Sequence, residues 1–190
     1  MSKMSTRNLV LAAILTALVI ILQFLGAFIK LGPFSISAVL VPIVIGAATC
    51  GVGIGAWLGL VFGIVVILSG DAALFLAVNV PGTIITVILK GTLCGFCAGV
   101  VYKLLARYNR YVAVAAAAVV CPLVNTGVFL LGCLVFFMQT VAGWAEAAGL
   151  GGNLAQYMIF GLVGANFLVE MGINIILSPV IVRLLNIKQK

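Results

Sequence analysis

The sequence predicts an all-α membrane protein, a bundle of six transmembrane helices with both termini in the cytoplasm. Of the 190 residues, 65% are apolar and only 7% are charged. The apolar residues form six continuous runs that do not alternate with polar residues, which argues against the strands of a membrane barrel. Most charged residues lie at or near the ends of these runs. A helix also satisfies its own backbone hydrogen bonds, as lipid requires.

The six runs are the candidate spans of one integral membrane domain, residues 1–190. A helix needs about 20 apolar residues to cross a bilayer core. The second and third runs are short, and Gly51 and Gly53 between them favour a helical hairpin or a broken helix. The last three runs are long enough to tilt or protrude. The runs cover 8–29, 34–48, 54–69, 82–105, 112–138 and 156–185.

The charge distribution predicts the orientation. Ten basic and three acidic residues give a net charge of +7. With six spans, three basic clusters fall on one side, and Lys30, Asp71 and Glu146 fall on the other, so the termini are expected in the cytoplasm. The positive charge therefore reflects membrane topology, and we expect no nucleic-acid partner. The clusters are Lys3 and Arg7; Lys103, Arg107 and Arg110; and Arg183, Lys188 and Lys190.

The composition argues against catalysis. The chain has no histidine, the commonest general base and metal ligand. It also lacks the G-x-x-x-x-G-K-[ST] loop of ATPases. Cys94 and Cys97 lie within an apolar run, where cysteines usually pack as small hydrophobic residues. We therefore expect no enzyme, no cofactor and no metal site.

Ionisable residues inside apolar runs are candidates for function, because charges in a membrane are costly. Glu170 lies halfway along the last run, with Asn166 and Asn174 one helical turn on either side. Positions four apart share a helix face. This polar stripe must face the bundle interior, where it either joins helices by hydrogen bonds or forms the wall of a ligand cavity.

The fourth run contains Lys90, with Thr86 on the same predicted face and Asn79 just before the run. Lys90 could extend toward the outer surface, pair with Glu170, or bind a ligand carboxylate. In the fifth run, Asn125 follows Pro122, which removes a backbone hydrogen bond and can kink the helix.

We expect the polar residues of the last three runs to converge on a mostly apolar pocket for a small organic molecule. Long outer loops at 70–81 and 139–155 are candidates for lids over it. The second of these loops carries Trp144, which we include among the substrate-binding candidates.

Small residues recur every four positions in two places, from Gly51 to Gly63 and at Ala13 and Ala17. Such spacing makes a flat face that lets helices approach closely. The sequence does not decide whether these faces pack within the chain or against another membrane subunit.

These residues resemble a known family, the substrate-binding membrane subunits (S components) of energy-coupling factor (ECF) vitamin transporters. The resemblance covers most of the chain and rests on LAAILTA at 11–17, LGPFSI at 31–36, IGA at 45–47 and GAWLGLVFG at 55–63. The pattern is most similar to the pantothenate subunits. They carry a basic residue, usually arginine, in the fourth span, where Lys90 stands here.

The resemblance implies a high-affinity capture subunit for ATP-driven import in the cytoplasmic membrane of a prokaryote. Ala13 and Ala17 would dock on a transmembrane coupling subunit, which two cytoplasmic ATPases serve. ATP hydrolysis would topple the subunit in the membrane and release substrate inside. The substrate would be a carboxylate-bearing vitamin, with pantothenate favoured and folate, biotin, niacin or another vitamin open. Two alternatives remain: an ion- or proton-coupled transporter using Glu170, and a structural membrane subunit without a small ligand.

Overall fold

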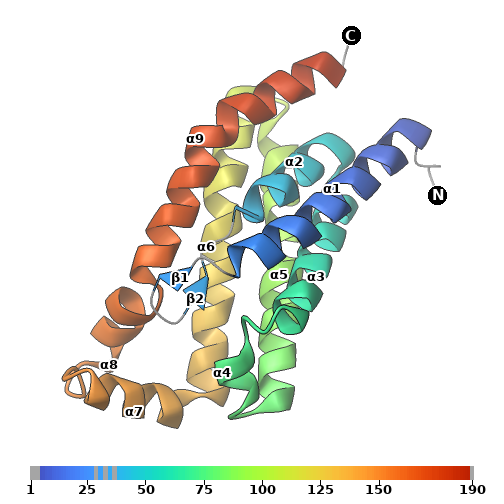
Figure 1. Cartoon of the computed structure of the whole chain (residues 1–190). Coiled ribbons are helices and arrows are strands. Elements are labelled where there is room, and N and C mark those ends of the chain that lie inside the picture. The colour runs from blue at the N-terminus through green and yellow to red at the C-terminus, as the bar shows by residue number, and fades with distance from the viewer. Residues whose placement is uncertain (1–4, 28–29, 32–33, 36–37, 189–190) are drawn as a thin grey trace.

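The computed structural model describes residues 5–27, 30–31, 34–35 and 38–188. Figure 1 shows long helices running side by side in one bundle, with short helices across one end. The elements are α1 (Thr6–Gly26), β1 (Lys30–Leu31), β2 (Phe34–Ser35), α2 (Leu40–Cys50), α3 (Val52–Leu68), α4 (Ala73–Leu76), α5 (Val80–Leu105), α6 (Arg110–Phe136), α7 (Met138–Ala147), α8 (Leu154–Gln156), the π-helix η1 (Tyr157–Gly164) and α9 (Ala165–Lys188). The expected all-α architecture is confirmed, apart from the two short strands.

Side-chain caps set the starts of the long apolar helices α1, α5 and α6. The Ser5 hydroxyl accepts from the backbone N–H of Asn8 at 3.3 Å at the start of α1. The Asn79 Oδ1 accepts from the N–H of Gly82 at 2.9 Å before α5. Asn109 begins α6, where its Oδ1 accepts from the N–H of Tyr111 at 2.8 Å. These oxygens satisfy N–H groups that the helix leaves without an internal partner.

The two ends of the bundle differ in their chain connections. The first turn of α1, the last turn of α9 and the connection from α5 to α6 lie at one end, and α4, α7 and α8 lie at the other (Figure 1). Arg7 in α1, Lys103 in α5 and Arg110 in α6 belong to the first end. The first turn of α1 and the last turn of α9 are therefore at the basic end, while Lys3 and Lys190 lie outside the described residues. The cytoplasmic placement of the termini stays a prediction.

Three described helices are long and apolar enough to cross a membrane: α1, α5 and α6. The pair Leu154–Gly164 and Asn166–Ile181 forms a fourth span if the two parts are counted together across their 46° bend. With 11 residues α2 is shorter than a span, and α3 with 17 residues is also short. The six-span arrangement therefore stays a prediction.

Several predicted boundaries differ from the structure. The run 34–48 begins with strand β2, whose Phe34 pairs with Leu31, and its helix starts only at Leu40. Residues 28–29 and 36–37 of the first two predicted runs lie outside the described residues. The break between α2 and α3 lies at Gly51, whose φ of 102° suits glycine because it has no side chain.

The expected lid loops and the last span also differ from the structure. In the predicted loop 139–155, α7 covers the residues up to Ala147, and its Val141 and Ala145 lie one turn apart and bury the same face of the helix. Residues 70–81 contain α4. The run 156–185, expected as one helix, begins with the π-helix η1 and bends before α9, and such helices are a common cause of bends.

The centre of the bundle is a glycine-lined contact between α3 and α5. A side chain on Gly55 would place its Cβ 2.6 Å from the carbonyl oxygen of Gly95, and one on Gly59 would overlap the Gly91 carbonyl. These contacts require hydrogen in place of a side chain. They hold α3 against α5 and thereby position Phe62 and Lys90, which come from these two helices.

Candidate functional site

A polar cavity lies between α1, α3, α5, α6, η1 and α9. Its volume is about 60 Å³. Its wall combines aromatic rings and small apolar groups with two carboxylates, one ammonium and three amides. The described lining residues are Gln23, Phe62, Asp71, Lys90, Asn125, Thr126, Phe129, Val163, Asn166, Phe167 and Glu170. Most of them lie in the part of their helix nearest the end opposite the termini.

Lys90 lies in the middle of the wall, on α5. Its Nζ is 5.5 Å from the ring centroid of Phe62 on α3 and 5.5 Å from that of Phe129 on α6. An ammonium over an aromatic face is stabilised by the negative face of the ring. The two rings therefore hold the ammonium at the cavity without neutralising its charge.

A smaller cavity of about 30 Å³ adjoins the first, and Asp71, Lys90 and Phe129 line both. Thr83 and Thr86 of α5 line the smaller cavity and are buried. Thr86, predicted as a binding residue, thus lies beside Lys90 on the same helix, one turn away. Lys90 is placed between a polar space and a mainly apolar one.

Two of the three residues in the predicted polar stripe of the last helix line the cavity. Asn166 and Glu170 line it, and Glu170 is 9% exposed. Asn174 is fully buried one turn further along, where its Nδ2 donates to the Glu170 backbone carbonyl at 2.9 Å. Asn174 is not among the described lining residues. Asn125 faces the stripe from α6 and is also buried.

Three amide oxygens of the wall are buried and have no hydrogen-bond partner among the described residues. They are Gln23 Oε1, Asn125 Oδ1 and Asn166 Oδ1. A buried polar atom without a partner costs about 1–3 kcal/mol. These three oxygens lie around one cavity, where they are available to accept hydrogen bonds.

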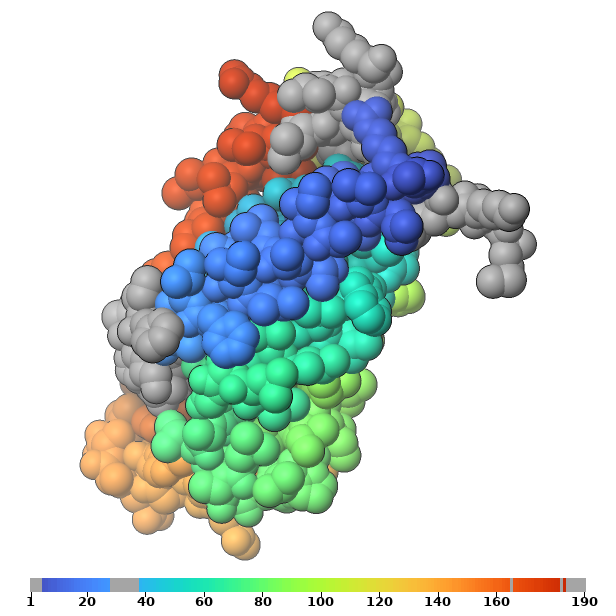
Figure 2. Space-filling view, turned by 45° about the vertical axis from the view of Figure 1, so that its right-hand side comes forward, coloured from blue at the N-terminus to red at the C-terminus, as the bar shows by residue number. Residues whose placement is uncertain are grey.

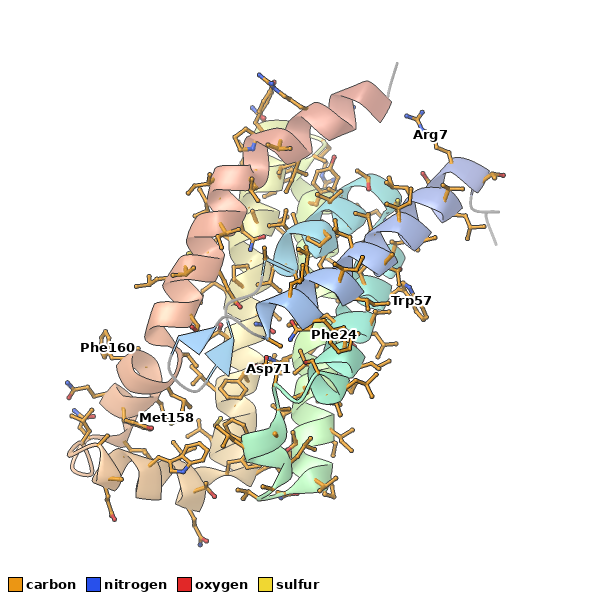
Figure 3. The ribbon with its side chains drawn as sticks, in the orientation of Figure 1. Arg7, Phe24, Trp57, Asp71, Met158 and Phe160 are labelled. Atoms are coloured by element: carbon orange, nitrogen blue, oxygen red, sulfur yellow. The ribbon has the colours of Figure 1, made fainter. Side chains whose placement is uncertain are left out.

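Gln23 and Asp71 are cavity residues that the sequence reasoning did not select. The Gln23 Nε2 donates to Asp71 Oδ2 at 3.3 Å. Figure 3 shows Asp71 where α3 ends, near the last turns of α1. Gln23 carried the same signal as Lys90, a polar side chain within an apolar run. Asp71 lies two residues after the third run, in a predicted outer loop.

Two other predicted binding residues have structural contacts away from the cavity. Asn79 caps α5 through the Gly82 N–H. Trp144 of α7 packs on Phe75, with ring centroids 5.5 Å apart, and Phe75 packs in turn on Phe129 at 5.5 Å. Because Phe129 also contacts Lys90, a chain of aromatic rings connects α7 with the cavity wall.

The cavity is smaller than pockets that enclose whole organic ligands, which measure about 300–1,000 Å³. Its η1 and α9 wall also borders an apolar groove of about 400 Å³, and Thr126, Val163 and Phe167 line both spaces. Phe160 of the groove points away from the bundle and is 73% exposed (Figure 3). The cavity of about 60 Å³ is therefore separated from a larger apolar space by the side chains of the η1 and α9 wall.

The predicted docking residues lie on a separate surface. Ala13 and Ala17 are exposed on α1, while Ala12 and Leu15 of the same helix are buried. Figure 2 shows α1 on the outside of the bundle, lying across α3. The Trp57 Nε1 of α3 donates to Thr16 Oγ1 at 3.3 Å and joins the two helices beside this surface. Ala13 and Ala17 are therefore available to another membrane helix.

Among the described residues, no three cysteine or acidic side chains form a group that could hold a metal ion.

Residues 7–182 match the model of a protein family described as the substrate-specific component of ECF transporters. No curated protein matches the chain. No solved structure matches it either.

Proposed function

The chain belongs to the family of substrate-specific components of ECF transporters, and on this premise we propose that it captures a carboxylate-bearing vitamin. Members of this family are transporter subunits and not enzymes. They associate with the membrane and ATPase subunits of an ECF module and take a small-molecule substrate. Our proposal adds the substrate class, the binding residues and the docking surface for this chain.

The observation that carries the proposal is the position of Lys90. Its ammonium lies in the wall of a cavity inside an apolar bundle, beside two aromatic rings that stabilise it without neutralising its positive charge. A carboxylate brought into such a site makes a charge-assisted hydrogen bond, which is stronger where water is excluded. Asn125, Asn166 and Glu170 then meet hydroxyl or amide groups elsewhere on the ligand.

Pantothenate is our favoured substrate, because the resemblance is greatest to pantothenate subunits and the molecule combines a carboxylate with an amide and hydroxyls. Folate, biotin and niacin also carry a carboxylate and remain candidates. The site lies toward the end of the bundle opposite the termini. With the termini in the cytoplasm of a prokaryote, the ligand reaches it from outside, past α4 and α7.

We further propose that Ala13 and Ala17 dock on the coupling subunit. Both are exposed, and two alanines one turn apart allow close helix approach. In this arrangement the ATPases supply the energy for import. Transport coupled to protonation of Glu170 is the second candidate, because Glu170 lines the same cavity. The family membership favours the ATP-driven function.

A binding screen on the full-length protein in detergent tests the proposal. We would titrate pantothenate, folate, biotin, nicotinate, riboflavin and thiamine by calorimetry. Lys90→Ala removes a charge-assisted hydrogen bond worth about 1.5–3 kcal/mol, which raises Kd by about tenfold to a hundredfold. Lys103→Ala is the matched control, since Lys103 is exposed at the other end of α5.

We expect one carboxylate-bearing vitamin to bind, with binding weakened in Lys90→Ala and unchanged in Lys103→Ala. Absence of binding to correctly folded wild-type protein would contradict the capture function. Equal binding by wild type and Lys90→Ala would show that Lys90 does not bind the vitamin. The capture function itself would still stand.

A further inference from the structure

Gln23 presents a buried amide whose orientation is fixed by its neighbour. Its side chain is 1% exposed and lines the cavity from α1. The Nε2 lies 3.3 Å from Asp71 Oδ2. The two ends of an amide are hard to distinguish, but a carboxylate only accepts hydrogen bonds. The amino end of Gln23 must therefore face Asp71, and Oε1 is the end left for another partner.

That oxygen has no hydrogen-bond donor among the described residues, although it is buried. Asn125 and Asn166 add two more amides of this kind to the same wall. The described wall also carries the carboxylates of Asp71 and Glu170, against one ammonium, that of Lys90. Among the described wall residues, the carboxylates thus outnumber the ammonium group, and three amide oxygens have no donor. A ligand with only a carboxylate would use Lys90 and leave the Gln23 oxygen without a donor.

We propose that Gln23 is a specificity-determining residue, and that the captured vitamin carries an N–H donor as well as a carboxylate. The N–H donates to Gln23 Oε1 while the carboxylate binds Lys90. Asp71 is a positioning residue, which holds the Gln23 amide with its oxygen available. This inference rests on the proposed capture function and narrows its substrate class.

The requirement for both an N–H donor and a carboxylate distinguishes among the candidate vitamins. Pantothenate has an amide N–H, biotin has ureido N–H groups and folate has several N–H groups, so each satisfies both requirements. Nicotinate has a carboxylate but no N–H donor at neutral pH. A donor matters here because a buried site that expects a hydrogen bond discriminates strongly against a ligand that lacks it.

The test combines a change in the ligand with a change in the protein. For the vitamin that binds in calorimetry, among pantothenate, biotin and folate, N-methylation removes an N–H donor. Pantothenate has one amide N–H to methylate, whereas the N–H groups of biotin or folate are methylated one at a time, and the derivative with the largest loss identifies the donor. Kd is measured for both ligands with wild type and Gln23→Met, which keeps the length of the side chain and removes its amide. We expect methylation to weaken wild-type binding by about tenfold and to have little further effect in Gln23→Met.

Gln139→Met is the matched control, because Gln139 is exposed on α7 and lies outside the described cavity wall. Asp71→Asn is a second variant in case Gln23→Met does not fold. We expect it to reduce the difference between the two ligands while Lys90-dependent binding persists. Glu146→Gln, at an exposed acidic residue of α7, is its control.

The outcomes distinguish this inference from the proposed function. Preferential binding of nicotinate would overturn the inference alone. Equal loss on methylation in wild type and Gln23→Met would also overturn it alone, because the effect would then be steric. Failure of every vitamin to bind the folded wild type would overturn the capture function and the inference together.

Discussion

Two helix faces of this protein carry small residues at a spacing of four, but one face is buried and the other is exposed. Gly55, Gly59 and Gly63 of α3 repeat every four residues and lie buried against α5. Ala13 and Ala17 of α1 have the same spacing and are exposed. The difference teaches that small residues four apart indicate close helix approach but do not identify the partner. One face assembles the bundle, and we propose that the other assembles the transporter.

The largest expected effect comes from adding one methyl group to the buried face. In Gly59→Ala, the new Cβ would overlap the Gly91 carbonyl, so α3 and α5 must separate. Overpacking typically costs about 1–3 kcal/mol, and here the obstructing atom is backbone that cannot rotate away. We expect a clearly lower Tm in detergent, measured by size-exclusion chromatography after heating.

Gly53→Ala is the matched control on the same helix. A Cβ at Gly53 would meet nothing within 4 Å, and the residue is exposed. Alanine also favours a helix over glycine by about 1 kcal/mol, so stability should not fall. A similar fall in Tm in both variants would show that the loss at Gly59 does not come from its close contact with α5.

The second effect concerns assembly and not stability. The double variant Ala13→Leu, Ala17→Leu places bulky groups on the exposed face of α1. We expect an unchanged Tm for the isolated chain but loss of co-purification with the coupling subunit, because the flat approach surface is gone.

Ala115→Leu is the control, since Ala115 is an exposed alanine on α6. It should assemble as wild type does. A double α1 variant that still assembled fully would contradict the docking role. A lowered Tm of that variant would mean that this face packs within the chain.

The smallest expected effect concerns the hydrogen bond that joins α3 to α1 beside the exposed alanine face. Trp57→Phe removes the hydrogen bond from the Trp57 Nε1 to Thr16 Oγ1, which joins α3 to α1. Trp57 is half exposed, so we expect a loss near the low end of the usual range of about 0.5–1.5 kcal/mol. A double-mutant cycle with Thr16→Val isolates the coupling between the two side chains. Strictly additive losses would mean that this hydrogen bond does not stabilise α1 on α3.

Much of the architecture could be predicted because lipid restricts the choices. Continuous apolar runs require helices, and the structure is helical nearly throughout. The pattern could not predict the strand pair before α2, the helix α7 or the π-helix η1. Those features depend on tertiary packing, such as the burial of Val141 and Ala145 on one face of α7.

In the candidate site, too, some residues could be predicted from the sequence and others depend on tertiary packing. Lys90, Asn125, Asn166 and Glu170 were selected as polar residues in apolar runs, and the structure brings all four to one cavity. Asn79 is a polar residue just before an apolar run, and it caps a helix, a role that depends on its place before Gly82. Asp71 was missed because its position after α3 becomes informative only when α1 brings Gln23 beside it. Whether these residues bind substrate stays a prediction.

The most direct test of the central claim is uptake by proteoliposomes. The chain would be reconstituted with its coupling subunit and two ATPases, with ATP in the compartment that faces the ATPases, and uptake of the radiolabelled vitamin from the opposite side would be measured. We predict uptake that requires both the chain and ATP hydrolysis. Uptake at the same rate without the ATPases, driven by a proton gradient and abolished in Glu170→Gln, would contradict the account.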